Sequence, residues 1–259
     1  RGTVSNGFRA PSLHQRMFSS VSTLFQSIGG VTVATQNLVA KNGSALANSF
    51  GIPQLGAEKS MQYTLGITSK PVKGKNISIT VDAYQIDIKD RIVLTGTFTK
   101  ASSALVAGLL AAYPDVNSVS FFTNAINTKT RGIDIVLNSG AIKTGNGILE
   151  ATLAYNQNKT TVEAVKSTDV LAADPNLANG TLFNRGEQGR FEWAQPRNKA
   201  TLALTYRVGK WTLMSRVSNF GEIRTLDVTN PVLDQKFSPK SIVDASLSYR
   251  PIYWMTVTM

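Results

Sequence analysis

Histidine, cysteine and clustered carboxylates are the usual carriers of chemistry, and they are scarce in this chain. His14 is the single histidine and there is no cysteine. General base catalysis needs a partner that orients the imidazole, and the sequence singles out none. One His without Cys also leaves a structural zinc site without ligands, and no loop has the Asp-rich spacing of a calcium site. We therefore predict no metal site, and we expect His14 to make a polar contact in a loop or a pore.

Three aspartates and two glycine-rich segments are the other candidates for chemistry. Asp82, Asp87 and Asp90 could act as paired acids, but the alternation of the chain predicts that they form a hydrated row on the polar face of a strand. Residues 145–147 and 186–189 lack the Lys-Ser/Thr ending of a phosphate-binding loop, so we expect turns or loops there. The sequence thus predicts no catalytic and no cofactor-binding residue, and a protein that is not an enzyme.

A basic and aromatic cluster could stack on and neutralise a nucleic acid strand. It consists of Arg185, Arg190, Phe191, Trp193 and Arg197. No recognition fold organises these aromatic residues, so we predict an external loop that faces anionic lipopolysaccharide or an anionic ligand, and no nucleic acid partner. The net charge of +11 attracts polyanions of either kind and does not choose between them.

The elements that must position these residues follow a period of two. Hydrophobic residues make up 42% of the chain, yet the mean hydropathy is −0.05, so apolar and polar residues are finely interleaved. No run of apolar residues reaches the 18 or so that a membrane-spanning helix requires. From Glu58 onward, alternating runs of roughly ten or more residues are joined in turn by tight turns and by long loops. This pattern is typical of antiparallel hairpins.

The first clear hairpin illustrates the pattern. One face of its first strand carries Met61, Tyr63, Leu65 and Ile67, and the turn follows at Pro71-Val72-Lys73-Gly74-Lys75. On the return strand the apolar phase changes from Ile77, Ile79, Val81 and Ala83 to Tyr84, Ile86 and Ile88. A change of phase by one residue predicts a β-bulge at that point.

Strand length and aromatic positions favour a membrane. The runs match the roughly 9 to 11 tilted residues that cross a bilayer. Aromatic residues near strand ends on the apolar face are typical of a girdle at the lipid boundary; they are Tyr63, Tyr155, Tyr206, Trp211, Tyr249 and Tyr253. We predict an all-β fold, an antiparallel transmembrane β-barrel segment of eight or nine strands, with long extracellular loops and a short packed helix within residues 101–113.

Several phrases resemble TonB-dependent outer-membrane receptors, particularly those of Bacteroidota-like bacteria. They are Gly7-Phe8-Arg9-Ala10-Pro11-Ser12, residues 82–92 (DAYQIDIKDRI), residues 123–134 (TNAINTKTRGID), Pro196-Arg197-Asn198-Lys199 and Asp244-Ala245-Ser246-Leu247-Ser248-Tyr249. The family's phrase Gly-Xaa-Asn-Asn-apolar-Phe and its closing strand do not follow. The resemblance implies that residues 1–259 are one partial β-barrel domain of a barrel of about 22 strands, with the plug domain and the first barrel strands absent.

The resemblance also implies a function. Such a protein lies in the cell outer membrane and imports a ferric siderophore, haem, cobalamin or oligosaccharide, energised through the TonB complex, which it contacts through the absent N-terminal part. We expect its loops near residues 23–49, 96–118 and 166–194 to capture the ligand, because recognition is usually placed on long loops. No individual ligand-binding residue is singled out.

Two other functions fit parts of the pattern. A self-contained outer-membrane barrel of about eight strands could serve as an adhesin or structural anchor. A soluble all-β binding protein is the second alternative, but its strands would be shorter, and its exposed face would not carry continuous Leu, Ile, Val and Tyr.

Overall fold

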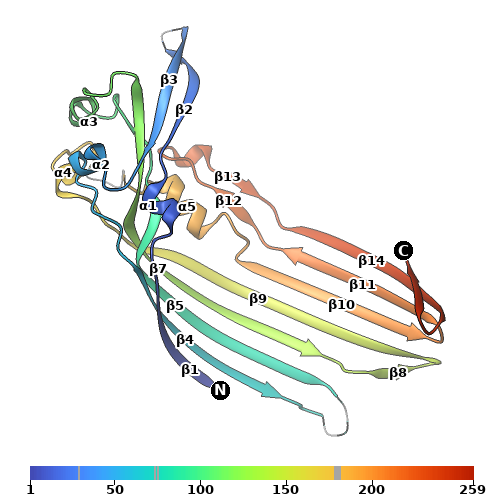
Figure 1. The fold of residues 1–259 in the computed structure, drawn as a ribbon. Coiled ribbons are helices and arrows are strands. Elements are labelled where there is room, and N and C mark those ends of the chain that lie inside the picture. The colour runs from blue at the N-terminus through green and yellow to red at the C-terminus, as the bar shows by residue number, and fades with distance from the viewer. Residues whose placement is uncertain (29, 73, 75, 178–181) are drawn as a thin grey trace.

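The chain folds into one large curved sheet, with its long connections and short helices gathered at one end (Figure 1). The computed structural model describes residues 1–28, 30–72, 74, 76–177 and 182–259. Lys73 and Lys75 of the predicted first turn lie outside the described residues.

Nine strands follow one another across the main path of this sheet, which we call the wall. Each wall strand pairs antiparallel with the next one. In spatial order they are β1 (Gly2–Arg9), β4 (Glu58–Ser69), β5 (Ser78–Leu94), β7 (Val116–Asn138), β9 (Gly147–Val165), β10 (Asn198–Val208), β11 (Trp211–Phe220), β14 (Lys240–Ile252) and β15 (Met255–Thr258). The spatial order follows the chain order, as in an up-and-down barrel, and the predicted antiparallel fold with eight or nine strands is confirmed.

The connections contain elements of their own. Short strands are β6 (Phe98–Thr99), β8 (Ile142–Thr144), β12 (Ile223–Thr225) and β13 (Gln235–Phe237). Helices are α1 (Leu13–Met17), α2 (Ala45–Ser49), α3 (Ala104–Leu109), α4 (Asp169–Ala172), α5 (Arg185–Glu192) and a 3-10 turn, Pro231–Leu233. The helix expected within residues 101–113 is therefore confirmed in a shorter form, α3. It begins after Ser103, whose hydroxyl accepts a hydrogen bond from the Val106 amide.

The segment 23–49 contains more structure than the predicted loop. A long hairpin, β2 (Ser20–Ile28) and β3 (Val31–Ala40), projects from the wall, and β3 pairs in parallel with the first part of β7 (Figure 1). This pairing is an exception to the antiparallel pattern. It was missed because local alternation does not reveal a partner strand about 80 residues away in the sequence.

One face of the wall is apolar and bare. Leu65, Ile67 and Val243 have 71%, 66% and 66% of their surface exposed. Within the described residues no second layer covers this face, and its leucines, isoleucines and valines line up across neighbouring strands; one row is Ile79, Leu137, Leu153, Leu202, Val217 and Val243. We call this apolar face the belt. Soluble sheets bury such a face, whereas a transmembrane barrel presents it to lipid.

Polar residues line the opposite face. Gly66, Asp82, Asp134 and Asn156 stand opposite one another across four strands, and the Asn156 amide donates to Asp134 at 2.5 Å. Within the described residues no helix is long and apolar enough to cross a membrane. The two faces of the wall thus differ in polarity: the belt is apolar and the opposite face is polar.

The predicted change of phase in β5 is wrong. The pairing of β5 with β4 and β7 runs without interruption from Ile79 to Ile88. Tyr84 and Ile86 consequently lie on the polar face, where the Tyr84 ring covers Gly132 on the neighbouring strand; a Cβ at Gly132 would lie 2.4 Å from the Tyr84 ring. The irregularity occurs later, around Asp90, which has a positive φ of 57°.

The aromatic residues mark both margins of the belt. Trp211 and Tyr249 are directly opposite each other near the turn end, with ring centroids 4.4 Å apart. Tyr206 shares that end and face, and Tyr63 and Tyr155 lie near the margin on the loop side. Tyr253 lies in the turn between β14 and β15. Five of the six expected aromatic residues thus flank the belt as a girdle would.

If the belt faces lipid, a charge should destabilise the wall on the outward face much more than at the adjacent residue on the polar face. Leu204, in the middle of β10, faces outward, and its neighbour Thr205 faces Glu150 on the polar side. We expect Leu204→Arg to lower the free energy of unfolding in a lipid bilayer by about 2–4 kcal/mol, because it places a cation in hydrocarbon. Thr205→Arg should change it by less than about 1 kcal/mol, since its charge meets water and a carboxylate. Urea unfolding in vesicles measures both; equal effects would contradict a lipid-facing belt.

Candidate ligand-binding loops

Long and short connections separate to opposite ends of the wall. The four long ones are residues 10–57, 95–115, 166–197 and 221–239, and the short ones are residues 70–77, 139–146, 209–210 and 253–254. Figure 1 shows the helices and the β2–β3 hairpin at the long-loop end. The described parts of the three segments expected to capture ligand, 23–49, 96–118 and 166–194, therefore lie at one rim.

Three of the long connections share one hydrophobic core. Phe50 follows α2, Phe98 lies in β6 and Phe121 in β7; their ring centroids are 5.0 to 6.2 Å apart and all three side chains are fully buried. Leu171 of α4 and Leu182 join the same core. Because the described residues 40–52, 98–116, 171–177 and 182 bury side chains together, they form one packed unit, which we call the cap.

Polar contacts tie the cap segments to one another. The Thr168 hydroxyl donates to the Phe50 carbonyl at 2.9 Å, and the Gly96 amide donates to the Leu182 carbonyl at 3.0 Å. Gly51 has a φ of 71°, and a Cβ there would lie 3.2 Å from Thr168, so this turn favours glycine. The cap is a fixed scaffold rather than three independent loops.

One face of the small sheet in the cap is lined by hydroxyl and amide groups. Asn37 of β3 and Thr99 of β6 both stand opposite Ser118 of β7, while Phe98 and Val119 point to the other side, into the core. The polar face borders a hollow of about 400 Å³. It is lined by Thr35, Asn37, Thr97, Thr99, Lys100, Ala101, Asn117 and Ser118. The Ser118 hydroxyl donates to the Asn37 side-chain oxygen, and the Asn117 side-chain oxygen accepts from the Gln36 amide; the remaining hydrogen-bonding capacity of the lining can serve a polar ligand.

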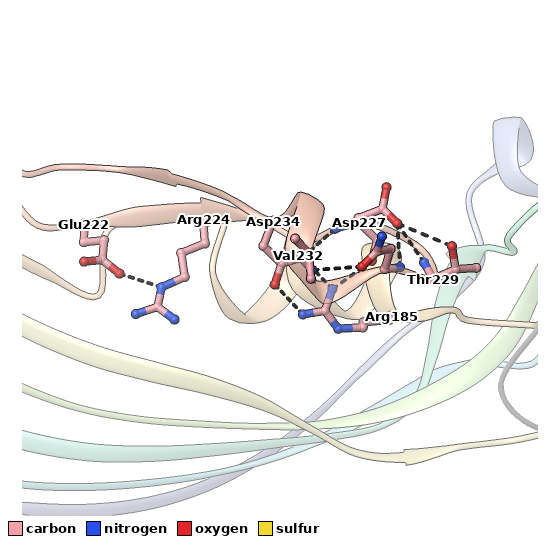
Figure 2. Close-up of polar contacts among 8 residues, drawn as sticks. Arg185, Glu222, Arg224, Asp227, Thr229, Val232 and Asp234 are labelled. Carbon is pink, nitrogen blue, oxygen red and sulfur yellow. Dashed lines mark hydrogen bonds and ion pairs between the residues drawn. The ribbon is translucent and has the colours of Figure 1, made fainter.

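The fourth long connection is held to α5 by an ion pair. The Arg185 guanidinium donates to both Asp234 carboxylate oxygens, at 2.6 and 2.5 Å, and to the Asp227 carbonyl at 2.9 Å. Asp234 also accepts from the Asp227 amide at 2.9 Å, and the Asp227 carboxylate accepts from the Thr229 and Asn230 amides. Figure 2 shows this network, with the separate pair between Glu222 and Arg224 beside it.

This network shifts the pKa of Asp234. The hydrogen bonds from Arg185 lower the pKa of Asp234 from 3.8 to about 2, and the same contact raises the pKa of Arg185. The charged form is favoured, so the loop contact is complete above the ordinary carboxyl pKa and is lost as the pH falls through about 2.

The residues of the basic and aromatic cluster contact other residues of the long connections. Arg197 and Arg224 lie over Trp193, with guanidinium carbons 3.2 and 4.4 Å from its ring centroid. Arg185 pairs with Asp234 and Arg190 with Glu187. The prediction that this cluster faces an external anion is therefore unsupported: three of its arginines are occupied by partners within the chain.

The other predicted residues do not form a site. His14 lies in α1 with its ring centroid 4.5 Å from that of Phe18. Asp82 lies on the polar face and pairs with Arg1, Asp87 lies on the outward face, and Asp90 pairs with Lys166 at the β5 irregularity. The expected single row of Asp82, Asp87 and Asp90 is wrong, because β5 keeps its register and successive odd and even residues point apart. Among the residues that the structure describes, no group of three His, Cys, Asp or Glu comes together around a common point.

The family model of TonB-dependent receptor-like β-barrels matches residues 1–258. The chain belongs to this family. TonB-dependent receptors are outer-membrane transporters and not enzymes, which agrees with the sequence prediction. No curated protein matches the chain.

Solved structures of similar fold support the assignment to a receptor barrel. The outer-membrane transporter YddB from Escherichia coli is 12% identical over 88% of this chain, with a TM-score of 0.55. The FrpB iron transporter from Neisseria meningitidis is 14% identical over 77%, with a TM-score of 0.51. FpvA of P. aeruginosa, solved with bound pyoverdines, is 12% identical over 99%, also with a TM-score of 0.51. The chain spans 30%, 25% and 26% of these proteins, so it corresponds to part of a receptor barrel.

The shared core of the cap gives a test of its rigidity. Phe98→Ala should loosen the receptor's cap by about 3–5 kcal/mol, because it leaves a cavity between three segments. Phe25→Ala on β2 is the control, since that side chain is 75% exposed. Limited proteolysis of the folded receptor in membranes should show faster cleavage in the cap for the first variant only. An unchanged cleavage rate would contradict a common core.

The pKa of Asp234 gives a second test. The carboxyl carbon signal of Asp234 in the NMR spectrum should titrate with a midpoint of about 2. In an Arg185→Gln variant the midpoint should rise toward 3.8, because the main donor is gone. Arg190→Gln is the control: among the described residues Arg190 pairs with Glu187 and not with Asp234, so the midpoint of Asp234 should stay where it is. If both variants shift the midpoint alike, the contact between Arg185 and Asp234 is not its cause.

Proposed function

We propose that this chain forms part of the wall and the ligand-capturing cap of a receptor that imports a scarce large nutrient across the outer membrane, energised through TonB. The observation that carries the proposal is the combination of a bare apolar belt with a cap of packed loops at one rim. A belt anchors a protein in lipid, and a preformed cap can bind a ligand with little loss of conformational entropy.

The rest of the receptor is part of the same proposal. In the described residues β1 and β15 are the two edges of an open sheet, so further strands would be needed to close a barrel. We infer that residues 1–259 are one partial barrel domain of about 22 strands, whose plug and remaining strands lie elsewhere in the protein. The TonB contact would then lie outside this chain. The Bacteroidota-like origin inferred from the local phrases is likewise a proposal.

The alternatives fit less well. A soluble binding protein would bury the belt, and the belt is exposed. A self-contained small barrel would join its first and last strands, whereas the described strands form an open path. An adhesin or an anchor therefore has less support than a transporter.

The polar lining of the hollow in the cap suits a ligand that presents hydroxyl and amide groups. Its lining offers Asn, Ser and Thr side chains, and Lys100 already donates to the Tyr113 and Pro114 carbonyls at 3.2 and 2.9 Å. An oligosaccharide meets this description, and so does a siderophore with a peptide backbone. Haem and cobalamin stay within the proposal as further cargo classes. Two of the similar structures have names that concern iron, and this favours testing iron first.

Growth of a deletion strain tests the proposal. Strains lacking the receptor should grow poorly when iron, cobalamin or a glycan is the limiting nutrient. The nutrient for which complementation restores growth identifies the cargo. Complementation with an Asn37→Ala/Ser118→Ala variant should raise the ligand concentration needed for half-maximal growth about tenfold or more, since two hydrogen-bonding side chains are lost. Thr161→Ala, on the outward face, is the matched control. Normal growth of the deletion strain under every limitation would overturn the proposal.

A further inference from the structure

One strand runs from the hollow in the cap to the polar face of the wall. β7 is continuous from Val116 to Asn138, and alternate residues of a strand share a face. Ser118 borders the hollow, and Asp134, an even number of positions later, lies on the polar face of the wall. At about 3.3 Å per residue, the strand between them is roughly 50 Å long. This face of β7 therefore connects the hollow with the surface that lines the pore in the proposed receptor.

The middle of this face of β7 is closed to solvent. Ile126 and Thr128 have 0% and 2% of their surface exposed, whereas Thr130, the next residue on the same face, is partly exposed. The cover comes from the third long connection, because Phe183 and Phe191 belong to one apolar cluster with Ile126. On the neighbouring strand β9 the cluster includes Val162 and Val165.

Helix α5 is attached to the wall at the level of this cluster. Arg91 of β5 stands opposite Ile126, so its side chain lies on the same face. Its guanidinium carbon is 4.7 Å from the centroid of the Phe191 ring. The Glu192 carboxylate accepts a hydrogen bond from the Val162 amide at 2.9 Å. The helix therefore rests on three neighbouring strands, β5, β7 and β9.

The other side of α5 packs on the fourth long connection. A Cβ at Gly189 would lie 2.7 Å from the Leu226 side chain, so glycine permits this close approach. At the start of the helix Arg185 pairs with Asp234. The contacts between α5 and the wall involve side chains and not the strand pairing itself, so the helix can leave the wall without breaking the sheet.

We propose that α5 is a barrier between the hollow in the cap and the pore, and that it must leave β7 and β9 before a molecule passes from one to the other. In the described residues, phenylalanine packing, a cation–π contact and a hydrogen bond hold it to the wall. Segments held by few contacts open locally without global unfolding. The inference deepens the proposed function, on which the identity of the polar face as a pore lining rests.

The experiment measures how fast a polymer-linked maleimide, which does not cross the membrane, reaches thiols in the full-length receptor on cells. The chain has no cysteine of its own, so thiols are introduced one at a time. Thr130→Cys places a reporter on the pore side of α5, and Thr97→Cys places one in the hollow. The test variants are Phe191→Ala and Glu192→Ala. Arg190→Gln is the matched control on the same helix, since that side chain is 73% exposed.

In the otherwise unchanged receptor, we expect the thiol at position 130 to react about tenfold or more slowly than the thiol at position 97, because the helix must open first. Each test variant should accelerate the reaction at position 130 about fivefold or more, since the open state becomes more populated when packing or a hydrogen bond is lost. The control variant should leave both rates within about twofold, as expected of a surface substitution.

Equal rates at the two positions in the otherwise unchanged receptor would overturn the proposal, and so would an unchanged rate at position 130 in both test variants. A parallel rise at position 97 would show that the substitutions loosen the whole cap, which would also contradict a barrier at α5. The maleimide is not a nutrient, so these rates do not depend on the cargo. A receptor that shows the barrier and yet imports no nutrient would refute only the proposed function.

Discussion

The rest of this structure depends on the satisfaction of backbone hydrogen bonds in a medium without water. Hydrocarbon offers no partner for an amide or a carbonyl, so each wall strand must find its partners in a neighbouring strand. The extended backbone that results turns successive side chains to opposite faces. Leu153 thus meets lipid while its neighbours Thr152 and Ala154 face the other way. The alternation in the sequence, the stagger of the belt and the exposure of so many apolar residues all follow from this one requirement.

The wall could be predicted because its signal is local. Alternation in segments such as 61–67 and 149–155 identifies the strands and their faces without knowledge of their partners. The phase of β5 could not be predicted in the same way. Tyr84 and Ile86 are apolar, yet they lie on the polar face, where Tyr84 fills the space left by Gly132 on the next strand. The absence of a side chain at Gly132 leaves room for the Tyr84 ring on the adjacent strand. This compensation can be recognised only when the pairing of the two strands is known.

The gathering of the long connections at one rim was predicted, whereas the packing that joins them was not. Long connections indicated the rim, but the core that joins Phe50, Phe98 and Phe121 depends on residues far apart in the chain. The alternation of Ser118 and Ser120 with Val119 and Phe121 was a usable signal for a strand with one polar and one apolar face within that rim. For the arginines of residues 185–197 the sequence showed their proximity but not their partners: Arg185 pairs with Asp234 on the next long connection, and Arg197 stacks on Trp193.

The parallel pairing of β3 with β7 has a consequence for how the molecule reaches its native state. Gln36 and Val116 come together only after a segment of about 80 residues, containing two complete wall strands, has been closed into a ring. Adjacent wall strands such as β10 and β11 need only a two-residue turn. The entropic cost of closing the chain is therefore smaller for the wall hairpins than for the pairing of β3 with β7, and contacts with a smaller closure cost form faster. Docking of β3 on β7 at the long-loop rim therefore carries a larger cost of ring closure than any hairpin of the wall.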